Sequence, residues 1–289
     1  MQEFNPDSLK QLYIPPSGSH KGQNGKLMII GGSHLFHAAS LWSLQVASKV
    51  VDMVFYSSVN ENNKIIQKSK EEFRNGIVVR RHDLEDYIKE ADCVLIGPGM
   101  VRASEGSKKQ ELRIKDMGDI EKIEDEGLQT YYLTKYLLEK YPDKKWVIDA
   151  GALQMMDPEW LLPLKGNAVL TPHPQEFERV FGDKEVGEMA KKYNCTILLK
   201  GEQDIVCSPG RCVMVSGGNA GMTKGGTGDV LAGLVAALAC NNELELAAVA
   251  GSYINKKAGD SLFEKVGYYF NASDLANEIP VVMKQLLTK

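Results

Sequence analysis

Residues 221–233, GMTKGGTGDVLAG, combine a glycine-rich stretch with one aspartate. The apolar run that follows predicts a helix over about residues 229–240, so the last amides of the stretch lie at a helix N-terminus. Unpaired N–H groups and the positive end of the helix dipole attract an anion there. Gly225, Gly226 and Gly228 let the backbone approach such an anion closely, because they carry no Cβ atom. The segment therefore predicts a phosphate site.

Asp229 stands at the helix start, where a negative charge would meet the bound anion. A carboxylate in this place can deprotonate a hydroxyl group that attacks a γ-phosphate. The alternative is a helix N-cap, which contributes about 1 kcal/mol and needs no chemistry. The loop is not a Walker A motif, and no G-x-G-x-x-G follows any of the predicted strands. An ordinary Rossmann dehydrogenase and a P-loop ATPase are therefore disfavoured.

Several short apolar runs, each followed by a turn signal, must position these groups. They are KLMII, MVFYSS, CVLIG, WVID, NAVLT and TILLKG. Runs of this length that are apolar on both faces suit central parallel strands, and the segments between them are long enough for crossover helices. The predicted fold is α/β, a doubly wound, mostly parallel central sheet with helices on both faces.

Ligands of such sheets collect at the carboxyl ends of the strands. The sequence therefore predicts that the residues just after the runs converge in one crevice. These residues are Gly31–Ser33, Gly97–Gly99, Asp149, Thr171–His173 and Lys200–Asp204. Helices are also expected over about residues 244–263 and 274–287.

Residues 1–289 are read as one domain, because no linker-like composition divides them. The charged stretch 102–126 is expected to be a solvated, mobile excursion, with a flap or a subunit contact as the alternative.

The net charge of −4 and the absence of a basic stripe argue against a nucleic-acid partner. The chain shows neither a signal peptide nor a run long enough for a membrane span, so we expect no membrane contact and a cytoplasmic protein. Five cysteines without a C-x-x-C pair signal neither a zinc site nor a disulfide framework, as in a reducing compartment.

The segment GMTKGGTGDVLAG closely resembles the signature of the ADP/ATP-dependent NAD(P)H-hydrate dehydratases, a branch of the ribokinase-like superfamily. MIIGGS, LIGPGM, VIDAGAL, LTPHPQEF, LLKGEQDIV and NASDL resemble further blocks of that family, in its order. The resemblance implies an enzyme that dehydrates hydrated NADH and NADPH with ATP or ADP as co-substrate. The ring hydroxyl would accept a phosphoryl group, and the phosphate would then leave as the ring double bond returns.

The resemblance also implies roles for individual residues. Asp229 would be the catalytic base and contact the substrate, and the amides of Gly226, Thr227 and Gly228 would form the anion hole. The adenine nucleotide would be bound by Lys200, Gly201, Glu202, Gln203, Asp204 and Gly228. From the residues alone, the segment 200–204 reads as a strand end followed by a turn.

On the substrate side, the resemblance points to Ala39, Gly99 and His173. Glu176 resembles an acidic position that serves Mg²⁺ and phosphate through water, and Asn167 is a further candidate for that water network. Mg²⁺ is also expected because a transferring phosphoryl group needs charge neutralisation. The alternative is that His173 is merely exposed at a strand end and that Glu176 caps a helix.

The chain departs from the family pattern at Ala38, in the VVD at 50–52, and at Val101, Gly151 and Gln175. Two other functions therefore stay open: a vitamin-precursor kinase of the same superfamily, and a nucleotide sensor without turnover. Too few residues precede KLMII for the epimerase domain that accompanies many relatives, so we expect any epimerase to be a separate protein. The oligomeric state, a homo-oligomer included, is left open.

Overall fold

The strands join in one sheet of ten in the computed structural model of the protein, which describes residues 1–69, 75–103 and 112–287. Their order is β1-β10-β9-β8-β7-β6-β5-β2-β3-β4. The strands are β1 Gln2–Glu3, β2 Lys26–Ile30, β3 Met53–Ser57, β4 Ile77–Val78, β5 Cys93–Ile96, β6 Lys145–Ile148, β7 Ala168–Leu170, β8 Thr196–Leu199, β9 Asp204–Cys207 and β10 Cys212–Val215. All six strands expected from the apolar runs are present.

The strands from β8 to β4 run parallel, whereas β9 is antiparallel to both β8 and β10. The chain order reverses between β5 and β2, which lie side by side with Leu27 opposite Cys93. In a doubly wound sheet a reversal of this kind opens a crevice at the carboxyl ends of the two strands.

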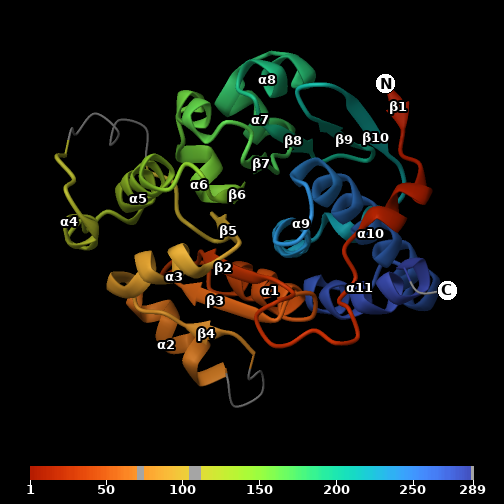
Figure 1. Ribbon diagram of the computed structural model, residues 1–289, viewed down its shortest axis with the longest axis horizontal. Helices are drawn as coiled ribbons and strands as arrows, with labels where there is room; N and C mark the ends of the chain where they lie inside the picture. Colours follow the sequence, from red (N-terminus) through yellow and green to blue (C-terminus); the bar gives the residue numbers. More distant parts are fainter. Residues whose placement is uncertain (70–74, 104–111, 288–289) are drawn as a thin grey trace.

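Helices cover both faces of the sheet (Figure 1). They are α1 Ala38–Ala47, α2 Asn60–Ser69, α3 Leu84–Glu90, α4 Met117–Glu121, α5 Glu126–Lys140, α6 Ala150–Met155, α7 Pro174–Phe181, α8 Val186–Lys192, α9 Thr227–Ala239, α10 Leu244–Val266 and α11 Ala272–Leu287. Short 3-10 helices occur at Pro6–Gln11, Arg81–Asp83, Pro158–Leu164 and Ala220–Thr223.

The two faces hold separate hydrophobic clusters, because successive side chains of a strand point to opposite sides. Leu27 and Ile29 of β2 pack with α1, α9, α10 and α11, while Met28 and Ile30 pack with α3 and with α4 to α8. In Figure 1, α1, α9, α10 and α11 accordingly lie on one side and α5 to α8 on the other. The expected doubly wound architecture is confirmed.

Helix α9 is buried almost all round, as its continuous apolar sequence requires. Gly233 lets it approach α1, since a Cβ atom there would lie 2.6 Å from the Cα atom of Ser43. The Ser43 hydroxyl donates a 2.7 Å hydrogen bond to the Asp229 carbonyl. Helix α1 therefore fixes the first turn of α9.

One expectation about the cysteines is wrong. Cys207 and Cys212 form a disulfide, although their spacing signals none. The reason is the turn between β9 and β10, which brings the two residues into register on adjacent antiparallel strands. The other cysteines, Cys93, Cys195 and Cys240, are free and buried.

The charged stretch also differs in part from expectation. Residues 117–121 form α4, and its Met117 and Ile120 are buried in the core rather than solvated. Two apolar side chains on one short turn of helix suffice to anchor it, which is too little to give a periodic pattern. Residues 104–111 of the same stretch lie outside the described residues.

Candidate active site

The loops after the central strands contact one another, as predicted for a common crevice. The Gly32 amide, after β2, donates a 2.7 Å hydrogen bond to the Pro98 carbonyl after β5. The Thr171 hydroxyl, after β7, donates to Oδ1 of Asp149 after β6 at 2.8 Å. Lys200, after β8, donates its amide to the Pro172 carbonyl at 2.8 Å.

The glycine loop turns sharply into α9 at Gly226, which is the N-cap residue of the helix. Gly226 has φ +96°, and a Cβ atom there would lie 2.3 Å from the ring of Trp42. A Cβ atom on its neighbour Gly225 would meet nothing within 4 Å in the part of the chain that the structure describes. Of these two glycines, only Gly226 is therefore required by the shape of the loop.

Helix α9 begins at Thr227, two residues before the predicted start. Asp229 therefore lies in the first helical turn and is not the N-cap residue, so the capping alternative is wrong. Thr227 helps to close the loop, since its hydroxyl donates to the Met222 carbonyl at 2.6 Å. Its amide makes only a long contact, 3.4 Å, with the Lys224 carbonyl.

The Asp229 carboxyl has a pKa raised to about 7. Burial is the main cause, and the negative charges of Asp149 and then Glu176 add to it, while Lys200 acts in the opposite direction. A carboxyl group with this pKa exchanges protons readily at neutral pH, as a general base requires.

Lys200 stands between the acidic side chains and the glycine loop. Its Nζ atom lies 3.1 Å from Oδ1 of Asp149 and 3.9 Å from Oε2 of Glu176. Burial lowers the pKa of this ammonium group, but the two carboxylates outweigh that effect and the pKa is raised. A Cβ atom on Gly228 would lie 3.4 Å from the same Nζ atom. A positive charge is therefore held directly beside the glycine loop.

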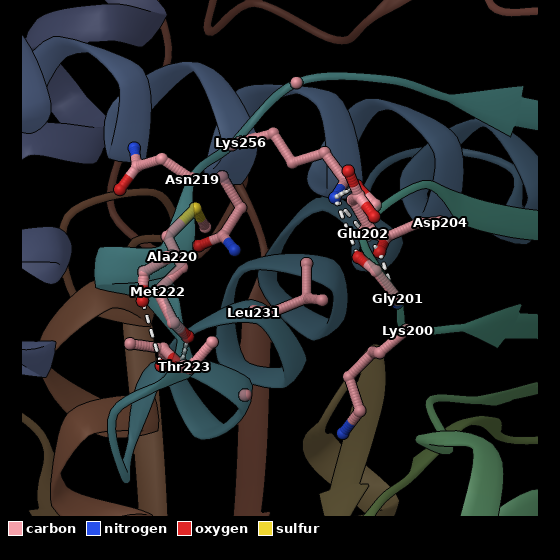
Figure 2. Close-up of a pocket in the computed structure, with 15 residues that line it drawn as sticks. Lys200, Gly201, Glu202, Asp204, Asn219, Ala220, Met222, Thr223, Leu231 and Lys256 are labelled. Atoms are coloured by element: carbon pink, nitrogen blue, oxygen red, sulfur yellow. Dashed lines mark hydrogen bonds and ion pairs between the residues drawn. The ribbon is translucent and has the colours of Figure 1, made fainter.

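A cavity of about 470 Å³ extends from this point between two chain segments, as Figure 2 shows. Lys200–Glu202 and Asp204 line one side, and Gly217–Ala220, Met222 and Thr223 line the other. The Leu231 side chain points into the space between them (Figure 2). Gly228 lies at the cavity wall, so the cavity and the glycine loop form one continuous site.

Lys256, on α10, holds the segment 200–204 in place (Figure 2). Its Nζ atom donates to the carbonyls of Gly201 and Glu202 at 3.1 and 2.9 Å and lies 3.3 Å from Oδ1 of Asp204. Asp204 also accepts hydrogen bonds from the Gly201 amide and the Ser252 hydroxyl. The Asp204 carboxylate thus shapes the loop. Gln203 is exposed and is not among the residues that line the cavity.

Lys256 was not among the residues predicted from the sequence. In the sequence it stands next to Lys257, and nothing in composition distinguishes the two lysines. In the structure the Lys256 side chain is 7% exposed, whereas that of Lys257 is 40% exposed. An apolar face of α10 that contains one lysine is the only signal the sequence offers.

His173 and Glu176 form a capping box at the start of α7. The Glu176 amide approaches Nδ1 of His173 at 3.3 Å, and the His173 amide donates to Oε2 of Glu176 at 2.9 Å. Glu176 therefore takes part in the capping box from the third helical position, and the N-cap residue is His173. The His173 side chain stays 45% exposed, so it is accessible to a ligand.

Ala39 lies close to Gly99. A Cβ atom added to Gly99 would be 3.0 Å from the Cβ atom of Ala39. Asn167, in contrast, precedes β7, and its carbonyl accepts the amide of Trp146 at the start of β6. Glu176 follows β7 at the carboxyl end of the sheet. Asn167 and Glu176 lie beyond opposite ends of β7, so the suggested water network between their side chains is wrong.

Gly151, one of the departures from the family pattern, has a structural reason. A Cβ atom at this position would lie 2.1 Å from the Met100 carbonyl oxygen. The close approach of the loop after β5 to the start of α6 leaves no room for a side chain at this position. The carboxylates that act on one another in the site belong to Asp149, Glu176 and Asp229.

Two relatives are similar to this chain over nearly its whole length. The chain is 38% identical over 96% of its length to a bifunctional NAD(P)H-hydrate repair enzyme of Methanocaldococcus jannaschii, of which it covers 51%. It is 33% identical to an ADP-dependent (S)-NAD(P)H-hydrate dehydratase of Nitrosopumilus maritimus, with 96% of this chain and 95% of that protein covered. The chain thus spans about half the length of the first of these relatives.

Solved structures show the same fold. A ribokinase-like superfamily protein of Enterococcus faecalis matches with a TM-score of 0.79 at 22% identity, covering 100% of this chain and 97% of that one. The ADP/ATP-dependent NAD(P)H-hydrate dehydratase of Bacillus subtilis, co-crystallised with ATP and Mg²⁺, matches with a TM-score of 0.74 at 21% identity over 99% and 98% of the two chains. The architecture is therefore ribokinase-like.

Across residues 1–69, 75–103 and 112–287, no helix has the length and apolarity to cross a membrane.

The family model described as NAD(P)H-hydrate dehydratase matches residues 27–281, which include every residue of the site described above. The chain belongs to the NAD(P)H-hydrate dehydratase family.

Proposed function

We propose that this domain converts hydrated NADH or NADPH back to NADH or NADPH in a reaction that consumes ATP or ADP. The observation that carries the proposal is the position of Asp229. Its carboxyl, with a pKa of about 7, lies in the first turn of α9, one residue after Gly228 at the wall of the cavity. A base and an anion site are thus presented to the same reacting centre.

The reaction takes two steps. Asp229 accepts the proton of the ring hydroxyl, whose oxygen forms a bond to the terminal phosphorus of the nucleotide while the bond to the leaving nucleotide breaks. The phosphate then departs with the electron pair of the C–O bond, and a proton is lost from the neighbouring ring carbon as the double bond returns. Phosphorylation is useful because phosphate is a far better leaving group than hydroxide.

Two groups stabilise the charge of the transferring phosphoryl group. The first-turn amides of α9 lack intrahelical acceptors and point toward the loop, where they favour an anion. The Lys200 ammonium group, 3.1 Å from Asp149, adds a fixed positive charge. Positive groups held in place before the reaction stabilise the transition state without reorganisation.

Mg²⁺ fits this site through water and phosphate. The structure, in the ranges it describes, places no three histidine, cysteine, aspartate or glutamate side chains together in a set that could hold a metal ion. Glu176 already accepts from Gln154 Nε2 at 2.9 Å and from the His173 amide. Mg²⁺ commonly keeps several waters and is held by substrate phosphates with one or two carboxylates. We assign it to the nucleotide phosphates, with Glu176 reached through water, where it would neutralise phosphate charge.

The hydrated dinucleotide is assigned to the crevice at the switch point, beside Ala39, Gly99 and His173. An epimerase that interconverts the two forms of hydrated dinucleotide would be a partner in the same repair process. The support is that the relative of Methanocaldococcus jannaschii is a bifunctional repair enzyme, of which this chain covers 51%. A cytoplasmic location stays a prediction.

The test is spectrophotometric. The purified protein is incubated with hydrated NADH, Mg²⁺ and either ATP or ADP, and the absorbance of the reduced nicotinamide is followed. We expect the absorbance to return with at least one of the nucleotides and not with the Asp229→Asn variant. If the wild-type protein binds nucleotide but never restores the absorbance, the dehydratase proposal fails and the kinase alternative takes its place.

A further inference from the structure

A second pocket, of about 210 Å³, lies toward the other end of the sheet from the 470 Å³ cavity. Ser58, which follows β3, and Arg81, which comes soon after β4, line it, whereas Lys200 of the cavity follows β8. In the order of the strands, the switch point between β5 and β2 lies between the two. We call the second pocket the acidic pocket, because the charged residues that line it are Arg81, Glu61, Glu121, Glu124 and Glu126.

Arg81 is a buried cation without a partner. The residue is 8% exposed, and its guanidinium group makes no hydrogen bond or ion pair with any residue in the described ranges. Nη1 is enclosed, but Nε and Nη2 are not among the enclosed unpaired atoms, so they keep accessible surface. Burial lowers the pKa of Arg81 to about 10, so the group stays charged at neutral pH. A buried charge without a partner is costly, and a ligand in the acidic pocket can supply the acceptor.

The glutamates restrict the chemistry of that ligand. Glu121 and Glu126 lie close enough to act on the pKa of Arg81, and Glu61 and Glu124 line the same pocket. An anion would meet four carboxylates and one cation there, so repulsion would outweigh attraction. A hydroxyl group suits the pocket, because it accepts a hydrogen bond from the guanidinium and donates one to a carboxylate. The acidic pocket therefore favours an uncharged group with neighbouring hydroxyls.

The acidic pocket adjoins the crevice at the switch point. Its Ser58 packs on the loop after β2, since a Cβ atom on Gly32 would lie 2.7 Å from the Ser58 Oγ atom. Glu126 contacts the same loop, because its Oε2 atom lies 2.6 Å from Nδ1 of His34. Gly32 in turn lies beside Gly99, whose would-be Cβ atom is 3.2 Å from the Gly32 Cα atom. A ligand held beside Gly99 can thus reach the pocket across this loop.

We infer that the acidic pocket binds the adenosine ribose of the hydrated dinucleotide through its 2′- and 3′-hydroxyl groups, and so selects hydrated NADH over hydrated NADPH. This inference rests on the proposed function, which brings the nicotinamide ring to Asp229. The other end of the dinucleotide then extends away from the nucleotide cavity, toward β3 and β4. Hydrated NADPH carries a phosphate in place of the 2′-hydroxyl, with about two negative charges. An acidic residue on the ribose 2′-hydroxyl gives the same discrimination in dinucleotide-binding sites of the Rossmann type.

Calorimetry in the absence of ATP and ADP tests the inference, because the hydrated dinucleotides then bind without turnover. We expect wild-type protein to bind hydrated NADH about tenfold more tightly than hydrated NADPH at low ionic strength, the usual effect of one hydrogen bond to a charged group. The preference should shrink at about 1 M salt, where the Debye length is only about 3 Å.

The double variant Glu121→Gln/Glu124→Gln removes two carboxylates of the pocket. Its affinity for hydrated NADPH should approach its affinity for hydrated NADH. The matched control is Glu188→Gln/Glu264→Gln, which changes the net charge of the chain equally. Its glutamates are exposed on α8 and α10 and lie outside the acidic pocket, so this control should keep the wild-type preference.

Arg81→Met removes the donor of the pocket. The variant should bind hydrated NADH about tenfold more weakly and leave the Kd for ADP unchanged, because ADP occupies the other cavity. The guanidinium has no partner in the described part of the chain, so its loss leaves no group of that part unpaired.

Equal affinity of wild-type protein for the two dinucleotides, or tighter binding of hydrated NADPH, overturns the inference, and this comparison does not depend on whether a variant folds. A preference of unchanged size in Glu121→Gln/Glu124→Gln also overturns it, as does unchanged binding of hydrated NADH by Arg81→Met. In these cases the absorbance assay decides separately whether the protein is a dehydratase. If neither hydrated dinucleotide binds and the absorbance never returns, the inference and the proposed function fail together.

Discussion

The Nζ atom of Lys200 lies 3.1 Å from Oδ1 of Asp149, and this pair joins the ends of two strands that are not neighbours in the sheet. The Asp149 side chain is 2% exposed. The same carboxylate helps to raise the pKa of Asp229, while Lys200 lowers it. Both members of this ion pair therefore act on the base, in opposite directions and after the larger effect of burial, and the pair holds a cation beside the glycine loop.

Replacing Asp229 by Asn should lower the activity strongly and stabilise the fold. The loss of a general base predicts a decrease in kcat of about 10²- to 10⁴-fold. The folded-state pKa of about 7 exceeds the unfolded value of 3.8, so the folded state binds more protons in between and the free energy of unfolding falls as pH rises through this window. Asparagine does not ionise and escapes this fall, a gain of roughly 1–3 kcal/mol at about pH 8.

Urea unfolding of both proteins at about pH 4 and pH 8 measures this effect. The free energy of unfolding of Asp229→Asn should exceed that of the wild-type protein by more at about pH 8 than at about pH 4. An equal difference at both values would show that the Asp229 carboxyl is not perturbed by burial.

The pH dependence of kcat/KM should follow the ionisation of Asp229. The base acts in its charged form, so kcat/KM should fall about tenfold per unit below about pH 7 and level off above it. In Asp149→Asn, a negative neighbour is removed and the pKa of Asp229 falls, so the inflection should move to lower pH.

Asp86→Asn serves as the control for this shift, because the Asp86 side chain is 81% exposed and is paired with Lys89 on α3. An unchanged inflection in Asp149→Asn would mean that another group limits the rate at low pH.

Gly226→Ala should destabilise the protein and weaken ADP binding. Alanine would be strained at φ +96°, and its Cβ atom would collide with Trp42 and Ala272. Strain and overpacking together predict a loss of at least about 2 kcal/mol in the free energy of unfolding.

The neighbouring Gly225→Ala is a matched control, since its Cβ atom would meet no atom of the described residues within 4 Å. We expect a change of less than about 0.5 kcal/mol in that variant. Thermal unfolding and ADP titration of both proteins give the comparison, and similar losses in the two would argue against a special geometry at Gly226.

Lys256→Met should loosen the segment 200–204. The variant leaves the Asp204 carboxylate buried without its cation, which predicts a loss of about 3 kcal/mol in stability. It also removes the hydrogen-bond donor of the Gly201 and Glu202 carbonyls. Because ADP must then order the loop when it binds, we expect the Kd for ADP to rise about tenfold.

Lys257→Met is the control for this variant, because its partly exposed ion pair with Asp260 contributes at most about 1 kcal/mol. If Lys256→Met binds ADP as wild type does, the segment 200–204 does not contribute to the nucleotide site.

The sequence by itself determined the central strands and the glycine loop that leads into α9. Continuous apolar runs such as KLMII and CVLIG are local patterns that predict buried strands. A glycine-rich stretch before an apolar helix is typical of a helix N-terminus that accepts an anion. The family resemblance could then be read from residues 221–233 and confirmed by the match over residues 27–281.

Only the tertiary structure decided how the charges are shared. Asp149, Glu176, Lys200 and Asp229 are far apart in the chain, and their mutual effects depend on burial and on separations of a few ångströms. The same holds for the disulfide between Cys207 and Cys212 and for the burial of Lys256. Each of these follows from which elements pack against each other, and residue type alone carries no record of that packing.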